Sequence, residues 1–373
     1  MQRATAYPSC RPLGRAPSRR QVLAGVAGLA LLPWCGRAGA QELRYFRIAT
    51  GTTGGTYFPI GRLIANAISN PPGSRPCDKG GSCGVPGLIA VAQATNGSVE
   101  NIDLLRSAEV EAGMVQADVA YWAYTGTGTY KGKPPFEQLR TIGTLYAEAI
   151  HIVARADSGI HTITDLKGKV VSVGEEGSGT LVDLRLVLQA YGMSEEDLQP
   201  RYLKPGTAAD RLERGEVEAF SIVGGAPVSA VSDVASRLPV RLVPIDGPAA
   251  EQLRRTHRFF AETVIPADTY PGVPAITTLS VGAELLVRAE TSDETIHGVT
   301  RALWHENTRR LLAEGHPKGR SIDPSRAVAA IAVPLHPGAE RYYREVGLSG
   351  GAANEAGEPP APKENPPGTK AGE

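Results

Sequence analysis

Short apolar runs alternate with amphipathic stretches along this chain, and the alternation restricts it to few fold classes. The apolar runs have the length of strands, and the stretches after them have the spacing of helices. The expected strands are residues 46–50, 90–95, 112–116, 150–155, 170–174 and 219–223. The expected helices are residues 58–69, 99–107, 119–124, 180–191 and 208–214. Strand–helix alternation with short Gly-rich links predicts an α/β fold with parallel sheets.

Two short motifs occur twice, in the same order. Residues 105–113 match residues 212–220, each at the end of an expected helix and before an expected strand. Residues 51–55 resemble residues 174–178, each a G-x-x-G-[G/S] turn between a strand and a helix. The two spacings differ by about the length of the Pro- and Gly-rich segment 71–86, which one half would carry as an insertion. The repeat predicts two similarly built lobes, the alternative being chance similarity between amphipathic helix ends.

The Gly-rich links place small polar residues where a strand ends and a helix begins. The first N–H groups of a helix lack intrahelical partners and the helix dipole is positive there, so each link is a potential anion site. Residues 96–98 and 224–227 are two more such links, with Ser98 suited to cap a helix and Pro227 suited to the first helical position. Ligands of open α/β sheets bind beyond the carboxyl ends of strands, so two lobes would enclose a cleft and close by a hinge. Alternatively, the glycines serve only tight turns.

Several function classes lack their sequence signatures. No lysine follows Gly55 or Gly179 as a phosphate-binding loop would require, and no G-x-S-x-G elbow or HExxH metal motif is present. His151 lies in an apolar strand and is interpreted as a core or hinge histidine. Glu175 and Glu176 would repel a carboxylate unless they point outward. We therefore expect no catalytic residues, no metal and no cofactor.

The N-terminus predicts export. The first forty residues contain six arginines and no acidic residue, so the remainder has 33 basic against 39 acidic side chains, which argues against a nucleic-acid partner. Residues 22–32 form an apolar run too short to span a bilayer, and Ser18-Arg19-Arg20 before it resembles a twin-arginine motif. We expect a signal peptide over 1–40 and a periplasmic protein. A lipoprotein signal at Cys35 and a disordered basic N-terminus are the alternatives.

Removal of the signal would leave Cys77 and Cys83 as the two cysteines of the chain. A disulfide between them would close a small loop and contribute about 2 kcal/mol to stability. A redox or metal role is the alternative, although no second cysteine pair follows. Residues 349–373 contain no large apolar side chain and are expected to be disordered.

Motifs along most of the chain resemble the TAXI group, the exported receptors of tripartite (TRAP-type) uptake systems. The matching segments are residues 51–59, 94–101, 115–120, 165–174, 177–180, 265–272 and 334–339. The resemblance implies a two-lobed type II periplasmic-binding-protein fold with a hinge between the lobes. Lobe I would comprise 44–155 plus 274–348, and lobe II would comprise 156–273. It also implies capture of a small organic acid, a carboxylate such as glutamate or 2-oxoglutarate, for delivery to a TRAP-type membrane permease.

The resemblance also implies which residues bind the ligand. Backbone N–H groups and hydroxyls would hold the carboxylate, Tyr57 would wall the cleft, and Gln116 or Asp118 would recognise an amino or keto group. Asp118 could instead cap a helix. A periplasmic sensor, an ABC-type receptor and an enzyme on the same fold are the competing functions. The expected ligand-binding residues are Gly54, Gly55, Thr56, Tyr57, Asn96, Gly97, Ser98, Gln116, Asp118, Ser178, Gly179, Thr180, Gly225 and Pro227.

Overall fold

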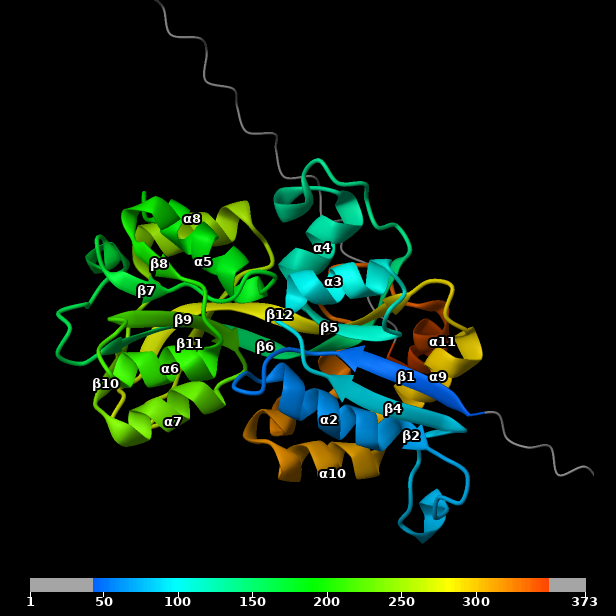
Figure 1. Cartoon of the computed structure of the whole chain (residues 1–373). Helices are drawn as coiled ribbons and strands as arrows, with labels where there is room; N and C mark the ends of the chain where they lie inside the picture. Colours follow the sequence, from blue (N-terminus) through cyan, green and yellow to red (C-terminus); the bar gives the residue numbers. More distant parts are fainter. Residues whose placement is uncertain (1–42, 349–373) are drawn as a thin grey trace, which may run out of the picture. The chain divides into compact units, whose positions relative to one another are not determined.

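The computed structural model describes residues 43–348 (Figure 1). The predicted signal peptide over 1–40 and the predicted disordered tail over 349–373 therefore lie outside the described residues. Within the described part, no helix is both long enough and apolar enough to cross a membrane.

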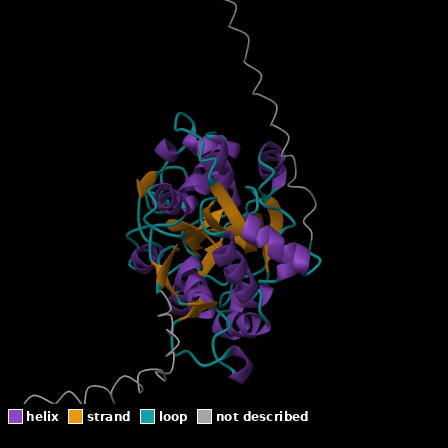
Figure 2. Ribbon diagram, turned by 90° about the vertical axis from the view of Figure 1, so that its right-hand side faces the viewer, coloured by secondary structure: helices purple, strands orange, loops and turns teal. Residues whose placement is uncertain are grey.

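One ten-stranded sheet forms the centre of the described chain, and helices cover both of its faces (Figure 2). Eight strands follow the order β4-β1-β5-β12-β6-β9-β7-β8, while β10 pairs with β6 and β11 pairs with β12. The strands of this sheet are β1 Arg44–Ala49, β4 Leu88–Gln93, β5 Ala112–Gln116, β6 Leu139–Arg155, β7 Val170–Ser172, β8 Gln199–Arg201, β9 Ala219–Gly224, β10 Val240–Leu242, β11 Ala261–Ile265 and β12 Ile276–Arg288. A separate small sheet pairs β2 Ser69–Asn70 with β3 Val85–Pro86.

The α-helices follow the strands in the alternation that the sequence predicts. Each predicted helix is present, and its ends differ from the prediction by only a few residues. The helices are α2 Tyr57–Ile68, α3 Ser98–Arg106, α4 Ala117–Thr125, α5 Gly179–Ala190, α6 Pro205–Glu213, α7 Ser229–Arg237, α8 Gly247–Thr256, α9 Asp293–Leu303, α10 Glu306–Gly315 and α11 Pro337–Glu345. Pro227 is not the first helical residue as expected, because α7 begins at Ser229 after the N-cap Val228.

Two long strands, β6 and β12, run through both lobes. β6 pairs with β12 as far as Ala149 and with β9 from Ala149 onward. β12 pairs with β11 at its start and with β5 from Ala283. β6 therefore carries the chain from lobe I, built on β1, β4 and β5, to lobe II, built on β7, β8 and β9. β12 carries the chain back.

This arrangement confirms the predicted two-lobed α/β fold and corrects one detail of it. The sheet is mixed rather than parallel, because β6 and β12 carry the chain in opposite directions and pair antiparallel. β5–β12 and β6–β9 are also antiparallel, while β1–β4 and β7–β8 are parallel. The exact bounds of the lobes, at 155/156 and 273/274, stay a prediction.

The side-chain period of the strands places a hydrophobic core on each face of the sheet. In β1, Phe46 and Ile48 pack in one cluster with α2, whereas Ala49 packs on the opposite face with residues of α3 and α4. Two further clusters cover the faces of lobe II, one with α5 and α8 and the other with α6 and α7. The lobes are thus each a sheet between two helical layers.

The repeated motif of the sequence corresponds to a repeated structure. α3 leads into β5 through a residue with positive φ, Ala108 at 60°, and α6 leads into β9 through Gly215 at 71°. In lobe I, Glu111 of the motif accepts hydrogen bonds from Arg47. In lobe II, the equivalent residue Glu218 accepts one from Lys169. Chance similarity therefore does not account for the repeat.

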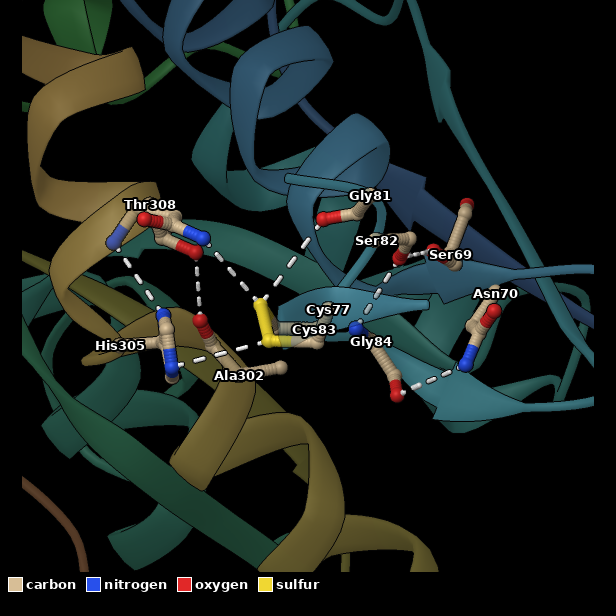
Figure 3. Close-up of a disulfide and its surroundings, with 11 residues drawn as sticks. Ser69, Asn70, Cys77, Gly81, Ser82, Cys83, Gly84, Ala302, His305 and Thr308 are labelled. Atoms are coloured by element: carbon tan, nitrogen blue, oxygen red, sulfur yellow. Dashed lines mark hydrogen bonds between the residues drawn. A yellow bond between two sulfur atoms is a disulfide. The ribbon is translucent and has the colours of Figure 1, made fainter. Parts of the chain in front are cut away.

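The predicted disulfide is present between Cys77 and Cys83, whose Cα atoms are 4.7 Å apart. Figure 3 shows it beside His305, the N-cap of α10, whose Nε2 lies 3.8 Å from Cys77 Sγ. The Asn307 amide donates to Cys83 Sγ at 3.4 Å. With both sulfurs bonded to each other, neither is available to a metal as a thiolate. We therefore interpret the disulfide as a structural cross-link.

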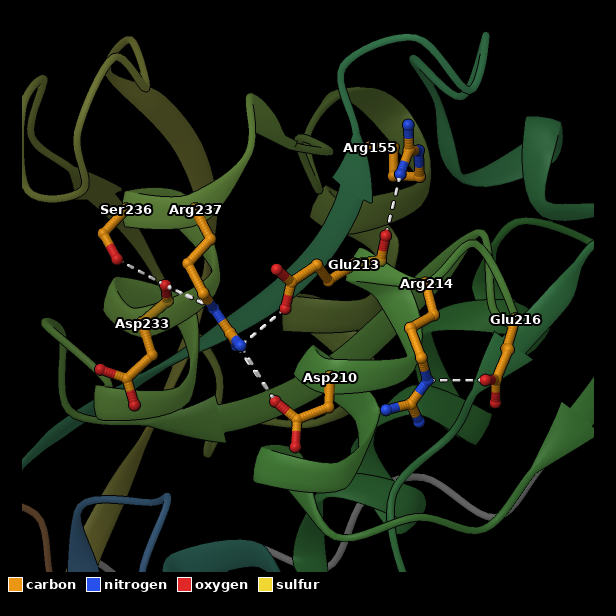
Figure 4. Close-up of polar contacts among 8 residues, drawn as sticks. All are labelled: Arg155, Asp210, Glu213, Arg214, Glu216, Asp233, Ser236 and Arg237. Atoms are coloured by element: carbon orange, nitrogen blue, oxygen red, sulfur yellow. Dashed lines mark hydrogen bonds and ion pairs between the residues drawn. The ribbon is translucent and has the colours of Figure 1, made fainter.

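Surface ion pairs connect α6 and α7, the two helices on one face of lobe II. Figure 4 shows Arg237 of α7 between Asp210 and Glu213 of α6, at 3.1 and 2.6 Å. Arg155 Nη1, at the end of β6, donates to the Glu213 carbonyl at 3.4 Å. Each exposed ion pair of this kind contributes less than about 1 kcal/mol to stability, so we assign these pairs only a local role in the packing of α6 against α7.

Candidate functional site

A small cavity of about 50 Å³ lies between lobe I and lobe II. Its wall is made of the Gly-rich turns that precede α2, α3 and α5, together with the ends of β5 and β9, one residue of β6 and the first residue of α6. The lining residues are Gly51, Thr52, Gly55, Thr56, Tyr57, Asn96, Gly97, Ser98, Gln116, Glu148, Glu175, Ser178, Gly179, Thr180, Pro205, Ser221, Ile222 and Val223.

Most of the residues expected to bind a ligand share this wall. They are Gly55, Thr56, Tyr57, Asn96, Gly97, Ser98, Gln116, Ser178, Gly179 and Thr180. Their contact with a ligand stays a prediction. They meet because each turn follows a strand of the same sheet, so the turns of the two lobes lie at facing strand ends.

The other four expected residues lie outside the wall. The Gly54 carbonyl accepts from Ala230 N–H of lobe II at 3.2 Å, and the Gly225 carbonyl accepts from the Thr56 hydroxyl of lobe I at 3.1 Å. These two glycines therefore join the lobes. Pro227 precedes α7 away from the cavity, and Asp118 is fully buried behind it.

Two helix N-termini open onto the cavity from opposite lobes. α2 begins at Tyr57 after the N-cap Thr56, whose side chain makes no capping bond. α5 begins at Gly179 after Ser178, whose hydroxyl accepts from Leu181 N–H at 3.1 Å. Among the described residues, no acceptor reaches the N–H groups of Tyr57 and Gly179. The free donors and the positive dipole ends of both helices favour an anion there.

The N-terminus of α3 is used differently. Val99 N–H and Glu100 N–H of lobe I both donate to the Gly177 carbonyl of lobe II, at 3.1 and 3.0 Å. Gly179 packs against Gln116 so closely that a Cβ on it would overlap the Gln116 side-chain oxygen. The structure is thus a closed arrangement, in which backbone groups of one lobe satisfy backbone groups of the other.

Two carboxyl groups also face the cavity. Glu148 of β6 is 2% exposed and accepts from the Tyr57 hydroxyl at 2.7 Å, and burial raises its pKa to about 8. Glu175 is 8% exposed, its Oε1 has no partner among the described residues, and burial raises its pKa to about 7. Of the two residues that would repel a carboxylate unless they point outward, Glu175 thus points inward and Glu176 is exposed.

A second acidic pair lies behind the cavity. Gln116 Nε2 donates to Asp183 Oδ2 of α5 at 2.7 Å, and Asp183 interacts with Asp118 of α4. Burial raises the pKa of both aspartates. Asp118 is not the N-cap of α4, which is Gln116. The hydrogen bond from Gln116 of lobe I to Asp183 of lobe II thus joins the lobes beside this pair.

His151 has the structural role that its apolar strand predicts. It is fully buried, its Nε2 accepts from the Tyr270 hydroxyl at 2.9 Å, and its Nδ1 lies 2.9 Å from the Ala149 carbonyl. The Tyr270 oxygen itself accepts from Val228 N–H at 2.9 Å, which leaves the phenolic proton for His151. Burial lowers the pKa of His151 to about 4, so it is neutral.

Sequence reasoning missed Glu148 and Ser221 of the wall. Glu148 lies inside a long apolar strand with no motif around it, and only the pairing of β6 between the lobes brings it to the cavity. Ser221 is 3% exposed, and its hydroxyl has no partner among the described residues. A polar residue inside an apolar strand is the one signal that could have indicated either.

Comparison with known proteins identifies one family. Residues 48–347 match the model of the NMT1-like family. A curated protein of Escherichia coli (strain K12), named "Putative aliphatic sulfonates-binding protein", is 32% identical over 125 residues, which are 34% of this chain and 34% of that protein. The alignment thus spans about a third of the length of that relative.

Solved structures share a loosely similar fold. The periplasmic aliphatic sulphonate binding protein of Escherichia coli has a TM-score of 0.40 and 18% identity, over 74% of this chain and 79% of that one. The alkanesulfonate-binding protein of Xanthomonas axonopodis pv. citri, bound to MOPS, has a TM-score of 0.41 and 16% identity, over 82% and 85%. At this level of similarity their ligands carry no information about the ligand of this chain.

The family match corrects the expected assignment to the TAXI group. The matching model is that of the NMT1-like family, and the curated relative is named for aliphatic sulfonates. The TRAP-type permease that this assignment implied as a partner is therefore not supported either.

Proposed function

Because the chain belongs to the NMT1-like family, we propose that it is a solute-binding receptor that captures a small organic anion between its lobes. The partner would be an ABC-type importer in the membrane, to which the receptor delivers its solute. The predicted export signal is in keeping with a periplasmic site of action.

The observation that carries this proposal is the pair of open helix N-termini. α2 presents Tyr57 N–H from lobe I and α5 presents Gly179 N–H from lobe II to one cavity. An anion that accepts from both would bridge the lobes and favour the closed form. Such donors bind an oxyanion without a charged side chain, since the helix dipoles supply the positive potential.

Sulfonates and carboxylates are the ligand classes that fit this arrangement. A sulfonate group has three acceptor oxygens and can accept from N–H groups on two sides. The name of the curated relative supports this class. The cavity volume of about 50 Å³ favours a small solute.

We further propose binding without turnover. Two of the three serine hydroxyls of the wall make structural hydrogen bonds: Ser178 donates to the Glu175 carbonyl at 2.6 Å, and Ser98 donates to Gln116 Oε1 at 3.3 Å. Neither is paired with a histidine, as an activated serine nucleophile would be. An unchanged ligand recovered after incubation with the protein would support this.

Thermal unfolding in the presence of candidate solutes tests the proposal. The panel contains alkanesulfonates, aminoalkanesulfonates, carboxylates, keto acids and amino acids, each at millimolar concentration. A solute present at 100 times its dissociation constant should stabilise the protein by about 2.7 kcal/mol. No shift with any solute, together with no retained solute in mass spectra of the denatured protein, would overturn it.

A further inference from the structure

The cavity combines two chemical features that a simple anion does not need together. The helix N-termini of α2 and α5 favour negative charge, whereas Glu148 and Glu175 place carboxyl groups in the same wall. We propose that the solute is a zwitterion whose cationic nitrogen is selected by Glu148 and Glu175, while its anionic group lies at the helix N-termini. This inference rests on the proposed function and names the ligand class of that site.

Glu148 is held in place for such a contact. Its Oε2 accepts from the Tyr57 hydroxyl at 2.7 Å, which fixes the carboxyl group near the N-terminus of α2. The residue is 2% exposed, and its side chain lines the cavity. A hydrogen-bond donor of a solute can therefore reach the other oxygen without rearrangement of the strand.

Glu175 supplies an independent observation. The residue is more than nine-tenths buried, and its Oε1 has no hydrogen-bond partner among the described residues. The Ser221 hydroxyl of the same wall is likewise buried and unpartnered. Buried polar atoms without partners are costly, so their presence in a ligand cavity indicates groups that a ligand satisfies. An ammonium group, with three N–H donors, matches this demand.

The protonation state of Glu148, and its change when a solute binds, depend on the titratable groups around it. Tyr57 of α2, Tyr146 of β6, Lys318 and the buried pair Asp118 and Asp183 are the titratable groups that influence it. Burial raises the pKa of Glu148 to about 8 and that of Glu175 to about 7, so both carboxyls hold protons for much of the time at neutral pH. A cationic nitrogen would stabilise the ionised carboxylates and expel these protons.

A simple anion would have the opposite effect. It would accept a hydrogen bond from a protonated Glu148 and hold that proton in place. The direction of proton transfer on binding therefore distinguishes the two ligand classes: release for a zwitterion, retention or uptake for an anion alone.

Calorimetric titration of matched solutes tests the inference. Each pair has the same anionic group with and without an amine: 2-aminoethanesulfonate and ethanesulfonate, and an α-amino acid and its deaminated acid for each carboxylate that shifts the unfolding transition. Titrations at pH 7 in two buffers of different ionisation enthalpy give the number of protons released. We expect the amine-bearing member to bind at least 10-fold more tightly and to release protons.

Three variants assign the effect to these residues. Glu148→Gln and Glu175→Gln should each reduce the preference for the amine-bearing solute over its amine-free partner at least 10-fold. Glu176→Gln, which changes the exposed neighbour of Glu175, should leave the preference unchanged. Equal or tighter binding of amine-free anions by the unaltered protein, or proton uptake with the amine-bearing solute, would overturn the inference and leave the receptor function intact. Absence of any solute binding would instead overturn the proposed function.

Discussion

Ala108 has a backbone conformation that suits glycine better. It has a φ of 60° after α3, and its counterpart after α6 is Gly215 with a φ of 71°. A Cβ costs about 1 kcal/mol in this left-handed region. Ala108→Gly should therefore raise the free energy of unfolding by up to about 1 kcal/mol, despite the greater entropy of glycine in the unfolded chain.

Urea unfolding measures this effect. The control is Gly215→Ala, the reverse substitution at the equivalent position of lobe II. No atom lies within 4 Å of the Cβ that this substitution would add, so only the backbone conformation should lower the stability. Destabilisation by Ala108→Gly, or no effect of Gly215→Ala, would contradict the structural equivalence of the two turns.

At the residue scale, the sequence predicts glycines and hydroxyls of the cavity but not its acids. Gly179 and Ser98 lie in turns whose position after a strand is local information. Glu148 is placed by the pairing of β6 with strands of both lobes, which is a long-range property. The inward direction of Glu175, and not of Glu176, depends on which of two adjacent turn residues faces the other lobe.

The start of α5 must approach β5 closely for the lobes to close. A Cβ at Gly179 would overlap the side-chain oxygen of Gln116, which is buried and donates to Asp183 at 2.7 Å, so Gly179→Ala should either displace this side chain from the cavity wall or hold the lobes apart. We expect the affinity for the solute to fall at least 10-fold in calorimetric titrations, with a small change in the unfolding midpoint.

Gly206→Ala is the matched control for this substitution. Gly206 also lies in the first turn of a helix of lobe II, α6, but has open space where the Cβ would be. Its affinity for the solute should equal that of the unaltered protein. Equal affinities of the two variants would show that the contact of α5 with β5 is not needed for binding.

The disulfide stabilises the folded protein by restricting the unfolded chain. Closing the short loop from Cys77 to Cys83 contributes about 2 kcal/mol by the chain-entropy estimate. The double variant Cys77→Ser/Cys83→Ser should lose this amount in urea unfolding, and a reductant should destabilise the unaltered protein but not the variant. A reductant effect on the double variant would show that another group is responsible.

Individual strands and helices follow from local periodicity, but their directions in the sheet do not. The apolar run at 150–155 predicts a strand, whereas β6 begins as early as Leu139. Its first part, residues 139–148, is mostly buried, because it pairs with β12 on one side and bonds to the segment 327–335 on the other, and so it lacks the alternation that marks a half-exposed strand. The antiparallel course of β12 likewise depends on where the chain returns from lobe II.

Buried carboxyl groups give the whole molecule an unusual dependence of stability on pH. Burial raises the pKa to about 8 for Glu148 and to about 7 for Glu175 and Glu284, above the value near 4.5 of unfolded chains. The folded state then binds more protons than the unfolded state, so stability is full below about pH 4.5 and falls as pH rises through these pKa values. His151, with a lowered pKa of about 4, acts in the opposite direction only below about pH 6.5.

The free protein should therefore lose on the order of 2–3 kcal/mol of unfolding free energy between pH 6.5 and pH 8. Urea unfolding at fixed ionic strength measures the loss. Glu148→Gln should reduce the slope, because the amide does not titrate. A stability that is constant or rises over this range would show that these carboxyls are ionised in the folded protein.

Closure of the two lobes around a solute would change the surroundings of Trp122, which lies between them. Trp122 of lobe I packs edge-on against Phe259 and His257 of lobe II, with ring centroids 5.6 and 5.9 Å apart. Trp304 instead donates to Tyr343 within lobe I at 2.8 Å. Opening of the lobes would expose the first indole and leave the second unchanged.

The decisive measurement is a tryptophan fluorescence titration with the solute that most stabilises the protein. We predict a saturable change with the dissociation constant found by calorimetry, which disappears in Trp122→Phe and persists in Trp304→Phe. A solute that binds by calorimetry without changing the fluorescence, or a change that persists in Trp122→Phe, would contradict capture between the lobes.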